Sequence, residues 1–333
     1  MKKTAALLLA VAMLLTLSGC HRAPLPEPTD TLVAAMDTEM NLRLYGDTDG
    51  SAAKALSAEI LRLNGVLSAA KEDSALSALN RFLTSEDKDL VFLLAEADRL
   101  NDRTGGALDV TLLPLSRLWG FFGTAYYVPS EEELTETRKR TGADRYTVQD
   151  GRITLKLDTE LDFGALAKGY AADQCRAYLE QLEMPALLSL GGNIQTVGTK
   201  PDGSDWLIGI QDPERQEECV LTLAVKGTKA VVTSGDYQRY FDYEGTRYCH
   251  ILDPATGSPV QNTLRSVTVV ADSGTLADGL STALFVMGRE AAAEHWRQSD
   301  DFEAVFVDKD GNIFLTAGLV GAVSGCTYTV IER

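Results

Sequence analysis

The apolar residues of the chain follow two different spacings, and the two kinds of segment alternate irregularly along its length. Apolar residues three and four positions apart predict helices, whereas alternating or short continuous apolar runs predict strands. Three pairs of predicted strands are joined by Asp-Gly or Glu-Gly turns at Gly151, Gly245 and Gly311, which is typical of antiparallel hairpins. Helices interspersed with hairpins favour an α+β fold with a mixed, largely antiparallel sheet and packed helices.

The elements can be placed by range. Asn64-Gly65 is expected to end the first long helix, and Gly105-Gly106 to end a later one. A capping box at Ser130 and Glu133 begins another helix, which is expected to reach about Gly142. Helices are expected over residues 52–63, 76–79, 90–100, 131–142, 165–182 and 291–296, and around Asp278. Strands are expected over residues 32–45, 146–148, 153–157, 186–190, 206–210, 220–225, 230–233, 264–271, 302–307 and 313–315.

Two stretches place polar residues within the predicted elements where these residues could bind a ligand or a metal. Residues 161–173 are expected to be the end of a strand that turns through Gly164 into a helix, with Asp162 and Lys168 on either side of the turn. Such a turn presents free backbone groups to an anionic ligand. Asp278 and Thr282 are four residues apart on a predicted helix, so their oxygen atoms face the same way. Hard oxygen donors beside such a turn suggest a magnesium-assisted nucleotide site.

Each of these residues also has a structural interpretation. Asp278 could favour a helix N-terminus, and Thr282 could form a hydrogen bond within its helix. Lys168 could be a solvated lysine on a helix surface. His250 could be a core histidine, and Cys249 is interpreted as a buried, inert thiol because its neighbours are apolar or aromatic.

Several familiar site motifs are missing from the sequence. The chain has neither a G-x-G-x-x-G fingerprint nor a Walker loop, and it has no G-x-S-x-G or H-E-x-x-H motif. Glycine-rich stretches that include or adjoin polar residues remain, and glycine lets backbone amides approach a phosphate or a flat ring closely. Taken singly, each of these stretches is most simply a turn; they are residues 104–109 (TGGALD), 190–193 (LGGN), 233–237 (TSGDY) and 250–257 (HILDPATG).

The N-terminus has the features of an export signal. Lys2 and Lys3 precede a short apolar run that ends in residues 17–20 (LSGC), and the run is too short for a stable transmembrane helix. LSGC resembles the lipobox of bacterial lipoproteins, which implies cleavage before Cys20 and lipid attachment to its sulfur. An ordinary signal peptide is the alternative. We therefore expect a signal peptide over residues 1–19, a lipidated Cys20 with a proline-rich tether to residue 30, and one catalytic domain over residues 31–333.

Charge and cysteine content narrow the range of partners. The formal net charge of −17 argues against nucleic acid and against a polybasic membrane-binding surface. An anionic cofactor stays compatible with this charge if a metal or local cations screen it. Cys175, Cys219, Cys249 and Cys326 form no C-x-x-C pair, so neither a zinc site nor a thioredoxin-like motif is expected.

Taken together and in order, the motifs resemble the ApbE family of FAD:protein FMN transferases. The resemblance covers nearly the whole chain after the tether, and it implies a T-fold-like core and an exported lipoprotein member. It rests on residues 36–38 (MDT), 104–109, 161–170 (LDFGALAKGY), 190–193, 233–237, 250–257 and 277–282 (ADGLST).

The resemblance also implies site roles. The predicted FAD-binding residues are Met36, Ala107, Leu108, Asp109, Asp162, Lys168 and Ile251. Mg²⁺ would be held by the Ala165 carbonyl, Asp278 and Thr282. FMN would pass from FAD to a threonine hydroxyl of an exported or membrane acceptor, such as a redox-complex subunit or an FMN-binding domain, and AMP would leave. His250, with an ordinary pKa near 6.5, could accept the threonine proton.

Two positions depart from the family pattern, and two other functions stay open. Asp37 stands where glycine is usual and adds a negative charge near the expected FAD. Ala70 stands where many members carry an aromatic residue beside the flavin. The same metal site would also serve FAD hydrolysis to FMN and AMP. A solute-binding lipoprotein would instead show two similar lobes joined by crossover strands.

Overall fold

The computed structural model describes residues 25–333 apart from 124 and 216. The predicted signal peptide, Cys20 and most of the predicted tether therefore lie outside the described residues. The end of that tether is corrected, because β1 already begins at Pro28. Within the described ranges, no helix is both long enough and apolar enough to cross a membrane.

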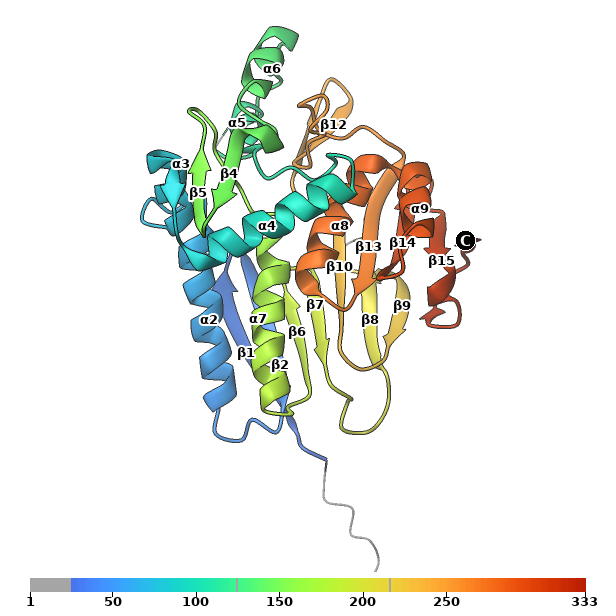
Figure 1. Cartoon of the computed structure of the whole chain (residues 1–333). Helices are drawn as coiled ribbons and strands as arrows, with labels where there is room; N and C mark the ends of the chain where they lie inside the picture. The colour runs from blue at the N-terminus through green and yellow to red at the C-terminus, as the bar shows by residue number, and fades with distance from the viewer. Residues whose placement is uncertain (1–24, 124, 216) are drawn as a thin grey trace, which may run out of the picture.

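A large sheet forms the centre of the fold (Figure 1). In the described part of the chain it has nine strands in the order β1-β2-β6-β7-β10-β13-β14-β15-β17. Neighbouring strands are antiparallel except for β15 and β17. The strands are β1 (Pro28–Ala35), β2 (Thr38–Tyr45), β6 (Ala186–Leu190), β7 (Asn193–Val197), β10 (Lys229–Gly235), β13 (Leu264–Ala271), β14 (Phe302–Asp308), β15 (Ile313–Thr316) and β17 (Thr329–Ile331). The predicted α+β class with a largely antiparallel sheet is confirmed.

Helices cover one face of this sheet, and a smaller sheet covers the other. Figure 1 shows α2, α7 and α8 lying along one face, with α4 crossing near their upper ends. Val232 points into this layer, while its neighbour Val231 packs into a second core with Trp206 and Leu223 of the small sheet. The helices are α2 (Ser51–Leu67), α3 (Ala75–Phe82), α4 (Lys88–Arg103), α7 (Ala167–Gln181), α8 (Gly274–Met287) and α9 (Arg289–Arg297); the small sheet is β8 (Trp206–Gln211), β9 (Cys219–Val225) and β16 (Val323–Ser324).

The remaining elements form a layer above the sheet that frames the site. Leu115, Trp119, Leu134 and Leu252 make a separate small core there, and the Trp119 indole donates to the Gly257 carbonyl at 2.8 Å. This bond ties the helical side of the layer to the loop after the β11–β12 hairpin. The elements are α5 (Leu113–Leu118), α6 (Glu131–Arg138), β3 (Thr84–Ser85), β4 (Tyr146–Gln149), β5 (Arg152–Leu155), β11 (Tyr240–Tyr243) and β12 (Thr246–Cys249), with a short 3-10 turn at Ala143–Arg145. A second 3-10 turn, Ala317–Leu319, follows β15, and its Leu319 packs into the second core.

Three local predictions are wrong for physical reasons. Residues 32–45 are not one strand, because Met36 and Asp37 adopt positive φ values of 50° and 58° and turn the chain into a hairpin. Helix α2 runs through Asn64-Gly65 to Leu67, since Leu63 and Leu67 continue its buried stripe. Residues 161–163 are extended but pair with no described strand.

Candidate active site

A single cavity brings together every predicted site residue except Cys20. It lies between the helical layer and the elements above the sheet. The predicted FAD-binding residues, the three predicted metal ligands and His250 all line it, although they are spread over more than 240 positions of the sequence. The lining residues among them are Met36, Ala107, Leu108, Asp109, Asp162, Ala165, Lys168, His250, Ile251, Asp278 and Thr282.

Glycines let α7 and α8 pack closely on the sheet side of this cavity. A Cβ atom on Gly169 would lie 2.2 Å from the Gly274 carbonyl oxygen and 2.7 Å from Cβ of Asp278. The Gly169 amide donates to Oδ2 of Asp278 at 2.8 Å. The side chain of the candidate metal ligand is therefore fixed by the neighbouring helix as well as by its own.

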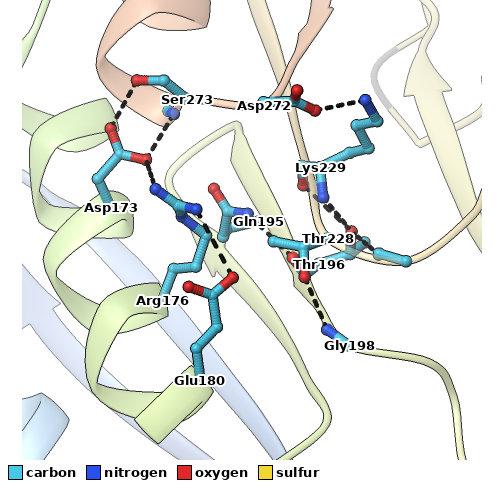
Figure 2. A network of polar contacts seen from close by, with 12 residues as sticks. Asp173, Arg176, Glu180, Gln195, Thr196, Gly198, Thr228, Lys229, Asp272 and Ser273 are labelled. Carbon is cyan, nitrogen blue, oxygen red and sulfur yellow. Dashed lines mark hydrogen bonds and ion pairs between the residues drawn. The ribbon is translucent and has the colours of Figure 1, made fainter.

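Asp173 holds the same two helices together from outside the cavity (Figure 2). Its carboxylate accepts from the Ser273 hydroxyl and from the amides of Gly274 and Thr275, each at 2.8 Å. These amides belong to the first turn of α8, where they have no partner within the helix. In Figure 2, Arg176 extends from the same helix between Asp173 and Glu180. Asp173 on α7 thereby sets the position of α8.

Asp278 is not a helix-end charge. It is the fifth residue of α8 and only 3% exposed. Burial raises the pKa of its carboxyl, while the nearby Lys168 charge opposes this rise. No described residue forms an ion pair with it within 4.0 Å. A buried carboxylate without an ion-pair partner is costly, so this position favours a bound cation.

Thr282 does not use its hydroxyl within the helix. Its Oγ1 lies 3.2 Å from the Ser234 Oγ of β10. It is Ser281 that bonds back, donating to the Asp278 carbonyl at 2.9 Å. The Thr282 hydroxyl consequently faces the cavity wall between α8 and β10.

The turn before α7 places a second carboxylate at the cavity. Asp162 accepts the Gly164 amide at 3.0 Å, and its own amide donates to the Val110 carbonyl at 2.8 Å. Burial raises the pKa of Asp162, while the charges of Arg239 and Lys168 oppose this rise. Lys168 is half-buried in the cavity wall.

Asp109 and Met36 are held in place by short polar contacts. Oδ1 of Asp109 accepts from the amide and the hydroxyl of Thr111 at 2.7 and 2.6 Å, and burial raises the pKa of the carboxyl. The Met36 amide donates to Oδ1 of Asn64 at 3.1 Å. Asn64 therefore supports the tight turn that carries Met36 to the cavity.

The fixed orientation of His250 determines which ring nitrogen is free. Its amide and its Nδ1 lie 3.0 and 3.2 Å from the carbonyl oxygen of Arg239. A carbonyl only accepts, so Nδ1 carries the proton and Nε2 of the neutral ring keeps its lone pair. Burial, then the Arg239 charge, lowers the pKa of His250 to about 4, which corrects the ordinary value assumed from the sequence.

Sequence reasoning missed several lining residues. Phe121 and Phe122 follow α5, and Arg239 comes two positions after the TSGDY motif. Asn193, at the end of the LGGN motif, is 2% exposed, and its side chain lies beside the Asp278 carboxyl, whose pKa it acts to lower. Arg239 and Asn193 could have been found from the sequence, because they stand just after or at the end of a glycine-rich motif. Phe121 and Phe122 belong to no such motif, so no sequence pattern pointed to them.

The donor set is consistent with magnesium rather than with a softer metal. In the described ranges, no three His, Cys, Asp or Glu side chains come together around one point. The three predicted ligands instead offer one buried carboxylate, one hydroxyl and one backbone carbonyl, all of them hard oxygen donors. Magnesium in proteins is commonly held by one or two carboxylates together with substrate phosphates.

Cys249 is buried, and burial raises the pKa of its thiol to about 11.

The comparison with known proteins agrees with this geometry. The model of the ApbE family matches residues 36–306. The chain belongs to the ApbE family. An FAD:protein FMN transferase of Vibrio cholerae is 37% identical over 85% of this chain and 88% of its own length, and one of Haemophilus influenzae is 34% identical over 88% and 90%. These similarities confirm the predicted family and enzyme class, a flavin transferase.

Solved structures confirm the fold. The ApbE protein of Thermotoga maritima superposes with a TM-score of 0.81 at 32% identity, covering 86% of this chain and 96% of that one. The flavin transferase ApbE of Vibrio cholerae superposes with a TM-score of 0.79 at 30% identity, covering 89% and 99%. The large sheet is continuous in the described residues, so the two-lobed arrangement expected of a solute-binding protein is not found.

Proposed function

We propose that this protein transfers FMN from FAD to a threonine hydroxyl of an exported or membrane acceptor protein, releases AMP and requires Mg²⁺. The observation that carries this proposal is the convergence of all the predicted site residues apart from Cys20 on one cavity. Family membership supports the flavin chemistry. The buried carboxylate, the nearby cations and the oriented imidazole support phosphoryl transfer.

The reaction exchanges the phosphoanhydride bond of FAD for a phosphoester bond to threonine. The threonine oxygen attacks the FMN phosphorus of FAD, and the bond from that phosphorus to the bridging oxygen breaks. AMP leaves with the bridging oxygen. The hydroxyl proton passes to Nε2 of His250, whose Nδ1 is held by the Arg239 carbonyl. The low pKa keeps His250 neutral near pH 7, where it can accept this proton.

The cation would be held by the Ala165 carbonyl, Asp278 and Thr282. When bound, Mg²⁺ neutralises the pyrophosphate and fixes the geometry for in-line displacement. Asp278 is held ready for this role by the Gly169 amide at 2.8 Å. Lys168 lies close enough for its charge to lower the pKa of Asp278, so it adds positive charge to the same region.

Anchoring of the enzyme outside the cytoplasm is part of the proposal. The LSGC sequence at residues 17–20 and the prolines after it support a lipid on Cys20 and a short tether. Strand β1 begins only eight residues after Cys20. Such a short connection would keep the catalytic domain close to the membrane surface and within reach of a membrane-bound acceptor.

Mass spectrometry of an acceptor tests the function directly. The full chain is incubated with FAD, Mg²⁺ and an FMN-binding domain of a redox-complex subunit, and the acceptor is examined for the mass of an added FMN. We expect this adduct on threonine together with an equal amount of AMP. AMP and free FMN without an adduct would show FAD hydrolysis instead, and FAD binding without AMP would show a flavin-binding protein.

A further inference from the structure

Arg239 is a cation of the cavity that forms no ion pair within 4.0 Å in the described structure, although its charge reaches the Asp162 carboxyl. It lies between β10 and β11, lines the cavity and is exposed to it. None of the ion pairs of the described residues includes it. Arg117 and Arg247, from neighbouring elements, are instead paired with Glu160 at 2.8 Å and Asp242 at 3.4 Å.

Arg239 forms no ion pair although acidic residues outnumber basic ones in this chain. The chain has 48 acidic and 31 basic residues, so acidic side chains are plentiful. Lys168, which also lines the cavity, likewise has no ion-pair partner among the described residues. The charges of both residues reach His250 and Asp162, which places the two cations around the same space. Because neither cation is held in an ion pair, both are available to an anionic ligand in this cavity.

Arg239 is also connected to the proposed base through its backbone. Its carbonyl oxygen accepts from the His250 amide and from Nδ1, at 3.0 and 3.2 Å. The base and the guanidinium are therefore carried by one local unit at the foot of the β11–β12 hairpin. A proton acceptor must lie beside the attacking oxygen, and that oxygen lies beside the phosphorus. The side chain of the same residue lines the cavity, so its guanidinium is available to the phosphoryl group.

We infer that the Arg239 guanidinium binds the non-bridging oxygens of the phosphoryl group in transfer and stabilises their charge as the bond to AMP breaks. This inference rests on the proposed function. In phosphoryl transfer the charge spreads over the equatorial oxygens, and a planar guanidinium can donate two parallel hydrogen bonds to them. Lysine carries the same charge without this fork, so it can replace arginine only in part.

The test compares Arg239→Gln and Arg239→Lys with a matched control, Arg247→Gln. Arg247 lies on the same hairpin but lines a different pocket, so its substitution removes one charge from the hairpin without reaching the cavity. We expect kcat for FMN transfer to fall about 10²- to 10³-fold in Arg239→Gln, as for other lost transition-state donors. Arg239→Lys recovers part of this loss. The KM for FAD changes less than kcat, and Arg247→Gln stays within about twofold of wild type.

Titration of His250 gives a second readout that needs no turnover. Arg239 and Lys168 are the charged groups that depress the His250 pKa beyond the effect of burial. NMR titration of the ligand-free protein should therefore show a higher His250 pKa in Arg239→Gln and an unchanged value in Arg247→Gln. An unchanged value in both would show that the guanidinium does not face His250, which would overturn the inference.

The outcomes separate this inference from the function on which it rests. A wild-type kcat in Arg239→Gln, or a loss confined to the KM for FAD, would overturn the role of Arg239 in the transition state. If wild-type protein releases AMP but forms no acceptor adduct, FMN transfer is refuted as the function. The role of Arg239 is then tested by comparing kcat for AMP release between wild type and Arg239→Gln. If wild-type protein releases no AMP at all, both proposals fall.

Discussion

Gly169→Ala is the substitution for which the structure gives the clearest expectation. The new methyl group would lie 2.2 Å from the Gly274 carbonyl oxygen and 2.7 Å from Cβ of Asp278, well inside normal contact distances. Both obstacles belong to α8, and one is backbone, so no side chain can move aside. Helices α7 and α8 would have to separate by roughly 1 Å to accept it.

The destabilisation caused by this clash is partly offset by the higher helix propensity of alanine. Alanine is about 1 kcal/mol better than glycine within a helix, whereas overpacking of a core costs typically about 1–3 kcal/mol and occasionally more. We expect the overpacking to dominate and the midpoint of thermal unfolding to fall by several degrees. Because Asp278 moves with α8, a displacement of about 1 Å should also reduce Mg²⁺-dependent turnover about 10²-fold.

Gly65 provides the matched control. It also lies within a helix, α2, but a Cβ atom there meets nothing within 4 Å. Gly65→Ala should stabilise the protein by about 0.5–1 kcal/mol and leave turnover unchanged. The assays are differential scanning calorimetry and AMP release from FAD with Mg²⁺. Unfolding midpoints that rise equally in both variants, with turnover intact, would refute the close helix packing and its link to Asp278.

Three further substitutions test the site and the anchor. Asp278→Asn keeps an acceptor for the Gly169 amide and removes a costly buried charge, so the ligand-free protein should unfold at the same or a higher temperature; AMP release over a Mg²⁺ titration should fall 10²-fold or more. His250→Ala should bind FAD in a fluorescence titration yet transfer FMN about 10²- to 10⁴-fold more slowly. In wild type, transfer should decline only as the pH falls towards about 4, since the neutral ring is the active form; a decline centred at 6.5 would contradict the lowered pKa. Cys20→Ala should move the protein from the membrane to the soluble fraction, and unchanged membrane retention would refute the lipid anchor.

The sequence predicted the site better than it predicted the surrounding backbone. Asp278 and Thr282 were paired from their helical spacing, and both line the cavity. Asp162 and Lys168 were linked because they flank one turn, and both of them line the same cavity. These pairs are local, so spacing along the chain was sufficient to relate the two members of each pair. Their meeting with His250 followed only from the family resemblance, because no local pattern brings the chain segments together.

The features that could not be predicted depend on tertiary contacts. Asn64 looked like a helix end, but in the fold its side chain accepts the Met36 amide while α2 continues past it. The His250 pKa depends on burial and on Arg239, 11 positions earlier, so no local sequence rule gives it. Phe121 enters the cavity wall only because the small core around Trp119 fixes the chain above the sheet.

The site is divided between two structural units with different tolerance to change. The candidate metal ligands belong to the tightly packed α7–α8 pair and its sheet, where even a methyl group on Gly169 does not fit. The upper wall of the cavity belongs to α5 and to the segments that flank the β11–β12 hairpin, where stacked rings such as Tyr126 on Phe241 leave one ring 53% exposed. If the proposed acceptor docks on this upper unit, substitutions there would alter which acceptor is modified while the metal half stays the same. A lineage of such enzymes could diversify its protein substrates without evolving the phosphoryl chemistry again.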